Sequence, residues 1–274
     1  MLAALDLYVT ALEPWPRVPF LGRALHAVAL QLLRSADATL AQEVHTGDGP
    51  RPFSVCGPFV GDDERLAPRL VPATSYRLRI SALTAPTAAA LARALEPERR
   101  PVELALDEVI VRLERVEATT DTYEGLRDRY FPTGPVRRTI ELTFLTPTSF
   151  HSGGKDVPLP LPELVFGSLL ERWNAYAPFT LSPGVRDFAR ECVGIAHYDL
   201  KAWVVNVAGG RHAGFVGRCG YRVLRYDPYW TRALCLLADF AFYSGVGIKT
   251  GMGMGACRRS DLDRPVPDRA GEQA

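Results

Sequence analysis

The same order of strand-like and helix-like segments occurs twice along this chain of 274 residues. In the first half, apolar residues at every third or fourth position predict a helix at Phe20–Arg34, and alternating apolar residues predict a strand at Val109–Glu117. The other predicted elements of this half are strands at Leu2–Leu12, Phe53–Val60 and Thr74–Leu83, and helices at Asp37–Glu43 and Pro86–Leu95. If the short second helix is left aside, the order is β-α-β-β-α-β.

The second half repeats this order. Its predicted elements are strands at Arg138–Thr146, Ile195–Val207 and Phe215–Tyr226, helices at Leu161–Tyr176 and Tyr229–Tyr243, and a short final strand. Two split βαβ units predict an α+β fold made of tandem ferredoxin-like βαββαβ domains. We expect these domains at residues 1–134 and 135–259, joined by a charged, turn-rich linker at Asp121–Val136. The polar tail at 260–274 is expected to be disordered.

A glycine-rich segment, Ser244–Gly255, precedes the final strand and contains five glycines, one lysine and one threonine. Glycine allows the backbone to approach a ligand closely, and successive free N–H groups can bind an anion. The segment is not a Walker A loop, because Ile248 and not glycine precedes Lys249. Too few residues follow it for a dinucleotide-binding βαβ unit. An extended polyanion such as RNA fits better, and a tight turn without a ligand is the alternative.

Charge and composition limit the partners further. The net charge is +1, but residues 1–136 carry 15 basic and 18 acidic side chains, whereas residues 137–274 carry 17 basic and 13 acidic. The second half is therefore the better candidate for a phosphate-facing surface. The sequence has no long uncharged apolar run, so no membrane partner is expected. Its five cysteines form no C-x-x-C pair, which favours reduced thiols in a cytoplasm over a zinc site.

Two histidines of the first half are candidates for acid–base chemistry. His26 lies within the first predicted helix and His45 follows the second. An imidazole can both accept and donate a proton near neutral pH, although each residue alone also fits a structural or surface histidine. None of the five histidines has the closely spaced partners of a metal site. We assign the remaining three to structure or surface, although the first of them could bind RNA: His151, His197 and His212.

Three segments in this order resemble the CRISPR-associated endoribonucleases that cut precursor CRISPR RNA, which are members of the RAMP superfamily. The first is Leu40–His45, followed by Gly49–Phe53, similar to the region of the family's catalytic histidine. The second runs from Phe144–Phe150 through Pro160–Leu170 and is similar to the opening of its second domain. The third is the glycine-rich segment Gly245–Gly255, similar to the RNA-associated signature of the superfamily.

The resemblance implies tandem RAMP domains that cleave repeat RNA without a metal or other cofactor, leaving a 2′,3′-cyclic phosphate and a 5′-hydroxyl. His45 matches the usual catalytic histidine, and His26 matches a second histidine found in some members. Arg51 falls where some members have a catalytic lysine. We favour His26 as base and His45 as acid, but the sequence does not order them. The residues expected to bind RNA are Gly245, Gly247, Lys249, Thr250, Gly251, Gly253, Gly255, Arg258 and Lys155.

The expected partner is therefore the CRISPR repeat within precursor RNA. A homodimer and transfer of the product to a CRISPR effector complex are further options. The main alternative is a non-catalytic RAMP subunit that binds guide RNA inside such a complex. A general RNA-binding module would need paired aromatic residues on a sheet, which the sequence lacks. A small-molecule enzyme would need one of the phosphate motifs excluded above.

Overall fold

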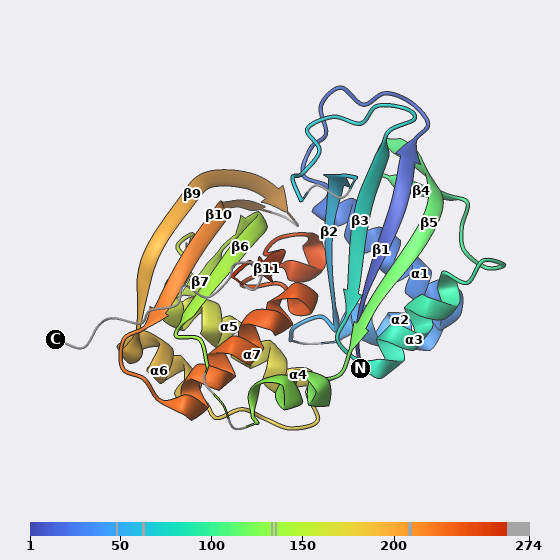
Figure 1. Ribbon diagram of the computed structural model, residues 1–274. Helices are drawn as coiled ribbons and strands as arrows, with labels where there is room; N and C mark the ends of the chain where they lie inside the picture. Colours follow the sequence, from blue (N-terminus) through green and yellow to red (C-terminus); the bar gives the residue numbers. More distant parts are fainter. Residues whose placement is uncertain (48, 62–63, 133, 135, 208–209, 262–274) are drawn as a thin grey trace.

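A computed structural model describes residues 1–47, 49–61, 64–132, 134, 136–207 and 210–261. These residues form two large antiparallel sheets with helices packed against each, and a separate two-stranded sheet, β7-β8 (Figure 1). The first sheet has the strand order β2-β3-β1-β5-β4, and the second has the order β11-β6-β10-β9. In both, the first strand of the unit lies between its third and fourth strands, and β4 adds an edge strand to the first sheet. This order confirms the expected tandem ferredoxin-like fold.

The bounds of most elements agree with the sequence prediction within a few residues. The strands are β1 (Leu2–Ala11), β2 (Phe53–Val60), β3 (Ser75–Ala82), β4 (Glu103–Leu106), β5 (Val109–Asp121), β6 (Thr139–Thr148), β7 (Phe150–Ser152), β8 (Lys155–Val157), β9 (Val193–Val207), β10 (Gly210–Val223) and β11 (Cys257–Arg259). The helices are α1 (Gly22–Ala36), α2 (Ala38–Thr46), α3 (Ala85–Ala94), α4 (Tyr123–Tyr130), α5 (Pro162–Tyr176), α6 (Gly184–Cys192), α7 (Pro228–Ser244) and the 3₁₀ turn η1 (Thr250–Met252).

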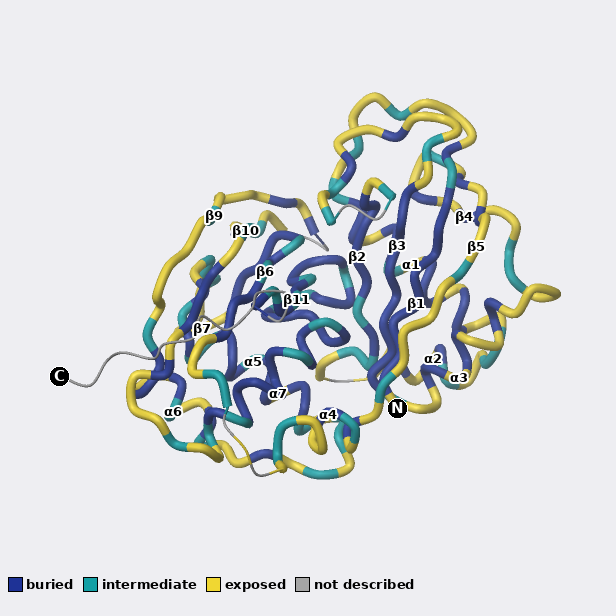
Figure 2. Tube along the Cα trace, in the orientation of Figure 1, coloured by how far each residue is buried: buried dark blue, intermediate teal, exposed yellow. Residues whose placement is uncertain are grey.

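Strand β1 is buried along nearly its whole length because both faces of its sheet are covered (Figure 2). Side chains alternate between faces of a strand. Leu5 and Leu7 accordingly point into the core beneath α1 and α3, whereas Leu2 and Ala4 join the core of the second domain. The two domains therefore pack through the sheet face that an isolated ferredoxin-like domain would leave open.

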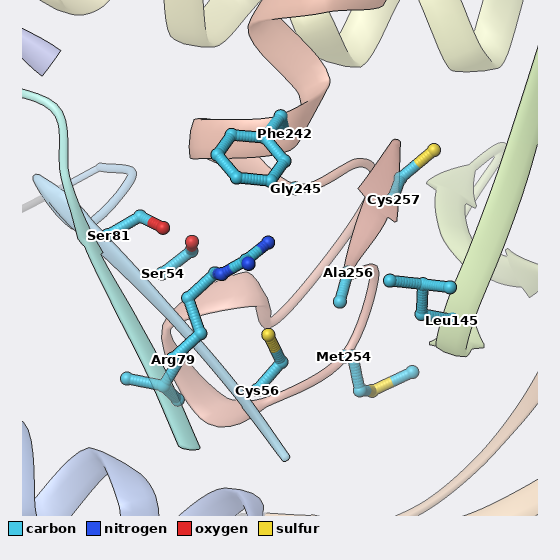
Figure 3. Close-up of a pocket in the computed structure, with 11 residues that line it drawn as sticks. Ser54, Cys56, Arg79, Ser81, Leu145, Phe242, Gly245, Met254, Ala256 and Cys257 are labelled. Atoms are coloured by element: carbon cyan, nitrogen blue, oxygen red, sulfur yellow. The ribbon is translucent and has the colours of Figure 1, made fainter. Parts of the chain in front are cut away.

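A buried charge network lies on this shared face. Arg79 donates from Nε and Nη2 to the two carboxylate oxygens of Asp6 at 2.8 Å, and its guanidinium lies 4.2 Å from the ring centre of Phe242 on α7. Figure 3 shows Arg79 and Phe242 beside a small cavity that Ser54 and Cys257 also line. This face of the first sheet is covered and cannot serve as an open platform for stacked bases. The observation argues against the alternative that the protein is a general RNA-binding module.

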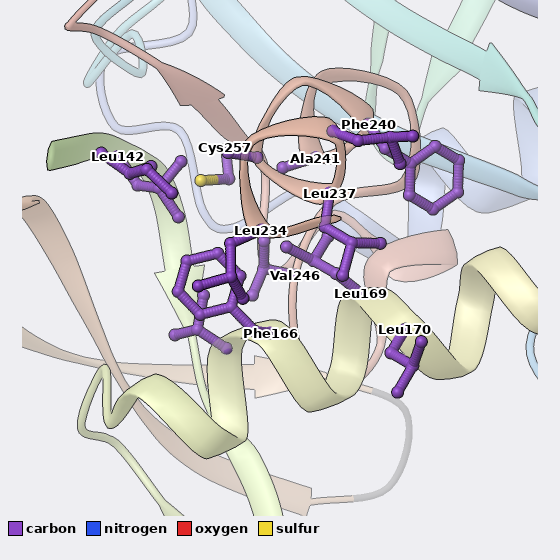
Figure 4. Close-up of a cluster of buried hydrophobic side chains, with 14 of the residues drawn as sticks. Leu142, Phe166, Leu169, Leu170, Leu234, Leu237, Phe240, Ala241, Val246 and Cys257 are labelled. Carbon is purple, nitrogen blue, oxygen red and sulfur yellow. The ribbon is translucent and has the colours of Figure 1, made fainter. Parts of the chain in front are cut away.

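The second domain has its own core, in which α5 and α7 pack against the sheet around β6. Leu142 of β6, Phe166 and Leu169 of α5, and Leu234 and Leu237 of α7 are all buried and meet in this core (Figure 4). Burial of a leucine or phenylalanine side chain contributes about 1.5–3 kcal/mol each. This core fixes the start of the glycine-rich segment, which follows α7. Among the described residues, no helix has the length and apolar character needed to cross a membrane.

The expected linker at Asp121–Val136 contains a helix, α4, and this part of the prediction is wrong. Thr122 caps α4 by accepting from the Gly125 N–H at 2.8 Å, and Tyr123 and Leu126 are buried in the core of the second domain. The helix has only eight residues and a charged outer face, so its sequence looks like a turn. Three other short features were also not predicted: the edge strand β4, the hairpin β7–β8 and the helix α6.

The expected disorder of the tail is wrong at its first two residues. Asp261 is buried and accepts from Nε and Nη2 of Arg259 at 2.7 and 2.8 Å. The Ser260 N–H donates to the Glu141 carbonyl at 2.8 Å, which prolongs the contact of β11 with β6. The charge pair and the strand contact hold these residues in place. The rest of the predicted tail, 262–274, lies outside the described residues.

Candidate active site

The glycine-rich segment of the second domain lies against α1 and β2 of the first domain (Figure 1). The closest approach is at Gly22, the first residue of α1, where an added Cβ would lie 1.8 Å from the Met252 carbonyl oxygen. On the other side, a Cβ added to Gly253 would lie 3.0 Å from the Gly22 Cα. Glycine is thus required on both sides because backbone packs directly on backbone.

His26 projects from α1 toward this contact. Its Nδ1 lies 2.8 Å from the carbonyl oxygen of Gly251, and its ring centre lies 5.4 Å from that of Phe53. A carbonyl oxygen only accepts hydrogen bonds, so Nδ1 carries the proton, and Nε2 holds a lone pair when the ring is neutral. The pKa of His26 is lowered, mainly by burial and also by the nearby charges of Arg51 and His45, whereas the bond to Gly251 opposes the shift. This arrangement favours a neutral imidazole that can accept a proton at Nε2.

His45 lies in the last turn of α2 and is exposed. Arg51 follows it and donates from Nη2 to the His45 carbonyl oxygen at 3.1 Å and from Nη1 to the Gly47 carbonyl. The guanidinium therefore satisfies carbonyl groups at the C-terminus of α2, where helices lack internal donors. A Cβ added to Gly251 would lie 3.4 Å from Arg51 Cβ, and the carbonyl oxygen of the same glycine binds His26. Arg51 therefore lies between His26 and the end of α2 that carries His45, and the three predicted catalytic residues form one cluster.

The glycine-rich segment does not form the open anion nest expected from its sequence. Four of its glycine N–H groups donate within the protein, to Ala241 O, Ser168 Oγ, Thr250 O and Pro147 O; these glycines are Gly245, Gly247, Gly253 and Gly255. The expectation that these N–H groups are free for phosphate is therefore wrong. The glycines instead allow tight packing between the domains.

The other predicted RNA ligands lie in different surroundings. Lys249 is half-exposed beside the cluster and adopts a left-handed backbone conformation with φ of 54°, whereas the side chain of Thr250 is buried. Arg258 forms an ion pair with Glu64 of the first domain. Lys155 pairs with Ser152 on the β7–β8 hairpin, which is a different element from those that carry His26 and His45.

A large cleft opens at the N-terminus of α1. Its volume is about 1070 Å³, and its walls come from both domains. Arg23 lines the cleft and lies one helical turn from His26, so it shares the same side of α1. The aromatic rings of Trp15, Phe20 and Trp203 also line the cleft. Asp107 and Glu108 line it as well, and Asp107 lies 3.8 Å from Arg23. The arginine and aromatic side chains of the lining are of the kinds that bind single-stranded nucleic acid.

Residues of α5 that the sequence analysis did not single out also reach the site. Ser168 and Arg172 bind Gly247, and the Tyr176 hydroxyl donates to the Pro50 carbonyl next to Arg51. The signal that could have identified them is their spacing of four residues, which places polar side chains on one side of a largely apolar helix.

Comparison with known proteins shows which sequences this chain resembles. The family model of the CRISPR-associated endoribonuclease Cas6 matches residues 142–257. A Mycobacterium tuberculosis CRISPR-associated endoribonuclease Cas6 is 34% identical over 135 residues, which are 49% of this chain and 43% of that protein. The match therefore spans less than half of that relative. A Streptococcus thermophilus Cas6 is 29% identical over 121 residues, 43% of this chain and 49% of that protein.

Solved structures extend the match to nearly the whole chain. A Thermus thermophilus Cas6 in a product complex is 30% identical and covers 95% of this chain and 100% of its own, with a TM-score of 0.76. The chain belongs to the CRISPR-associated endoribonuclease Cas6 family. A second Cas6 product complex, also 30% identical, covers 94% of this chain and 99% of its own at a TM-score of 0.73. A RAMP protein that is 17% identical shares only the fold, with a TM-score of 0.62.

Proposed function

We propose that this Cas6-family protein cuts CRISPR repeat RNA within the precursor transcript and so releases guide RNAs. The observation that carries the proposal is the cluster of His26, His45 and Arg51 against the glycine-rich segment. The cluster unites two imidazoles and a cation, which are the groups needed for acid–base cleavage at a phosphate. Relatives solved as product and substrate-mimic complexes support a role in catalysis.

In the proposed reaction, the ribose 2′-oxygen attacks the adjacent phosphorus in line and the bond from phosphorus to the 5′-oxygen breaks. His26 Nε2 takes the 2′ proton, and His45 donates a proton to the departing 5′-oxygen. The products are a 2′,3′-cyclic phosphate and a 5′-hydroxyl. The lone pair at Nε2 of His26 supports this assignment, since Nδ1 is engaged with Gly251.

Arg51 is proposed to stabilise the extra negative charge of the phosphorane. Its two hydrogen bonds to carbonyl groups use two of five guanidinium N–H groups. The remaining donors can face a phosphate, and such preorganised donors contribute about 3–4 kcal/mol in comparable sites. Lys249 is proposed to bind the RNA backbone beside them. The cleft lined by Arg23 and Trp203 is proposed to hold unpaired nucleotides next to the scissile bond.

Cleavage by the purified protein tests the proposal. Repeat RNA should be cut in the presence of EDTA, and mapping of the product ends should find the cyclic phosphate and the 5′-hydroxyl. We expect His45→Ala to lose most of the single-turnover rate, at least about 100-fold. A fully active His45→Ala variant would reject the assigned chemistry.

The non-catalytic alternative predicts a different outcome of the same assay. A guide-binding RAMP subunit would bind the repeat RNA but leave it uncut without other subunits.

Assembly is a separate part of the proposal: a homodimer and transfer of product to an effector complex are tested by size-exclusion chromatography with light scattering, with and without RNA. A cytoplasmic location is also proposed, and the five free, buried cysteines support it.

A further inference from the structure

A row of polar side chains on α5 faces the glycine-rich segment and the loop that carries Arg51. Ser168, Arg172 and Tyr176 follow one another at intervals of four residues, so they lie along one side of the helix. The same helix supplies Phe166 and Leu169 to the apolar core. The row is therefore mounted on an element that the core holds rigidly.

Two members of the row hold one residue of the glycine-rich segment. Ser168 Oγ accepts from the Gly247 N–H at 3.1 Å, and Arg172 Nη2 donates to the Gly247 carbonyl at 3.0 Å. Gly247 has φ of 80°, and a Cβ there would lie 2.2 Å from the Ser149 carbonyl oxygen. Both polar backbone groups of Gly247 are thus fixed by α5, four residues before the Gly251 carbonyl that binds His26.

Tyr176, the third member of the row, contacts the loop that carries Arg51. The Tyr176 hydroxyl donates to the Pro50 carbonyl, and Arg51 follows at once and binds the His45 and Gly47 carbonyls. Burial raises the pKa of Tyr176, so the phenol keeps its proton and remains a donor throughout the neutral range. One helix of the second domain thereby contacts both the glycine-rich segment, whose Gly251 binds the His26 ring, and the loop whose Arg51 binds the His45 carbonyl.

Arg172 is an unusual choice if stability were the only requirement. Arg172 is 8% exposed, Nη1 has no hydrogen-bond partner among the described residues, and the neighbouring Glu171 pairs with Arg186 instead. Burial lowers its pKa to about 10, so it remains a cation at neutral pH. A buried, unpaired cation is costly to a fold. The hydrogen bond from its Nη2 to the Gly247 carbonyl points to a role in the placement of that segment.

We propose that Ser168, Arg172 and Tyr176 are positioning residues, which hold the glycine-rich segment and the Pro50–Arg51 loop in the relative placement that RNA cleavage requires. The inference rests on the proposed endoribonuclease function. Ser168 and Arg172 act on His26 through Gly247 and Gly251. Tyr176 acts on His45 through Pro50 and Arg51. None of the three is proposed to touch the reacting atoms.

The test of Tyr176 separates catalysis from binding. Tyr176→Phe removes only the hydroxyl, and we expect the single-turnover rate at saturating protein to fall about tenfold while the Kd for repeat RNA changes less than about twofold. Tyr198→Phe, at an exposed site on β9, is the matched control and should cut at the wild-type rate. A Tyr176→Phe variant with the wild-type rate would overturn this part of the inference.

The test of Ser168 and Arg172 uses the pH dependence of the rate. In Ser168→Ala and in Arg172→Lys, the loosened segment should leave His26 better hydrated, so the acid limb of the single-turnover profile should move toward pH 6.5. Hydrogen–deuterium exchange of residues 244–255 should rise in both free variants. An unmoved acid limb together with unchanged exchange would overturn the proposed positioning.

These outcomes distinguish the two proposals. If the wild-type protein fails to cut repeat RNA, the proposed function is rejected and the positioning role falls with it. If the wild-type protein cuts and the three variants behave like it in rate, pH profile and exchange, only the positioning role is rejected. Thermal unfolding of each variant checks that a slower rate does not come from lost folded protein.

Discussion

His26 Nδ1 and the Gly251 carbonyl oxygen lie 2.8 Å apart although 225 residues separate them in the chain. The bond joins α1 of the first domain to the glycine-rich segment of the second. It fixes the tautomer of His26 and leaves Nε2 free to accept a proton. The orientation of this imidazole therefore depends on correct docking of the two domains.

The pH dependence of cleavage should report the environment of His26. A base must be neutral, so the rate should fall as the pH drops through the pKa of His26, which burial holds below its ordinary value of 6.5. The acid limb of the single-turnover profile should thus have its midpoint below pH 6.5, and His26→Ala should lose this limb together with most of the rate. The lowered pKa would be contradicted if the acid limb had its midpoint above pH 6.5 in the wild type and was absent in His26→Ala.

Substitution of Gly22 should damage catalysis by displacement of the glycine-rich segment. In Gly22→Ala the new Cβ would meet the Met252 carbonyl oxygen at 1.8 Å, so the segment must move and the bond of Gly251 to His26 weakens. We expect the single-turnover rate to fall about tenfold to a hundredfold, since small misplacements of catalytic groups have effects of this size. The control is Gly210→Ala, where the new Cβ meets His212 Nε2 at an ordinary 3.4 Å. Equal rates in both variants would show that the close approach has no role.

Arg51 should affect the rate more than RNA binding. In Arg51→Ala the carbonyl groups at the end of α2 lose their donors and the phosphorane loses a cation, so we expect a loss of about 100-fold to 1000-fold in single-turnover rate. Arg51→Lys retains the charge but not the planar fork, and should lie between Arg51→Ala and the wild type. Titration of the same variants with repeat RNA should find Kd changed by less than about fivefold. A large rise in Kd with an unchanged rate would instead assign Arg51 to binding.

The buried charge network between the domains should govern stability. Asp6 pairs with Arg79 and also with Arg77, whose Nη1 lies 3.6 Å from Asp6 Oδ2. Asp6→Ala therefore leaves both buried arginines without this carboxylate. We expect the free energy of unfolding, measured by urea titration, to fall by about 3–5 kcal/mol. Asp187→Ala removes an exposed partner of Arg190 and should change it by less than about 1 kcal/mol. Similar losses in the two variants would indicate that the buried network has no special role.

Local periodicity was sufficient for the long elements and failed for the short ones. The helix α5 and the strand β2 have the predicted bounds to within a residue. The helix buries one repeating face, and the strand is a short run that is buried on both faces. The helix α4 was missed because its burial comes from two residues, Tyr123 and Leu126, in a charged segment. A pattern of two apolar residues in a charged segment is the same as that of many turns.

The glycine-rich segment was identified from its composition but misinterpreted in its geometry. Glycine content predicts close backbone approach, and the sequence does not say what approaches. The structure places Gly22 and Ser149 of the protein itself against this segment, at Gly253 and Gly247, and hydrogen bonds within the protein occupy four of the expected N–H groups.

The amino-acid sequence by itself determined the two βαββαβ units and named His26 and His45 as candidates, because hydrophobic periodicity and residue chemistry are local properties. Arg51 became a candidate only through the resemblance to a known family. Only the tertiary structure decided which nitrogen of His26 is free, which glycine N–H groups are already bonded, and that Tyr176 reaches Pro50. The contacts of His26 and Tyr176 join segments more than a hundred residues apart. Such contacts exist only once the two cores have formed and the domains have packed face to face.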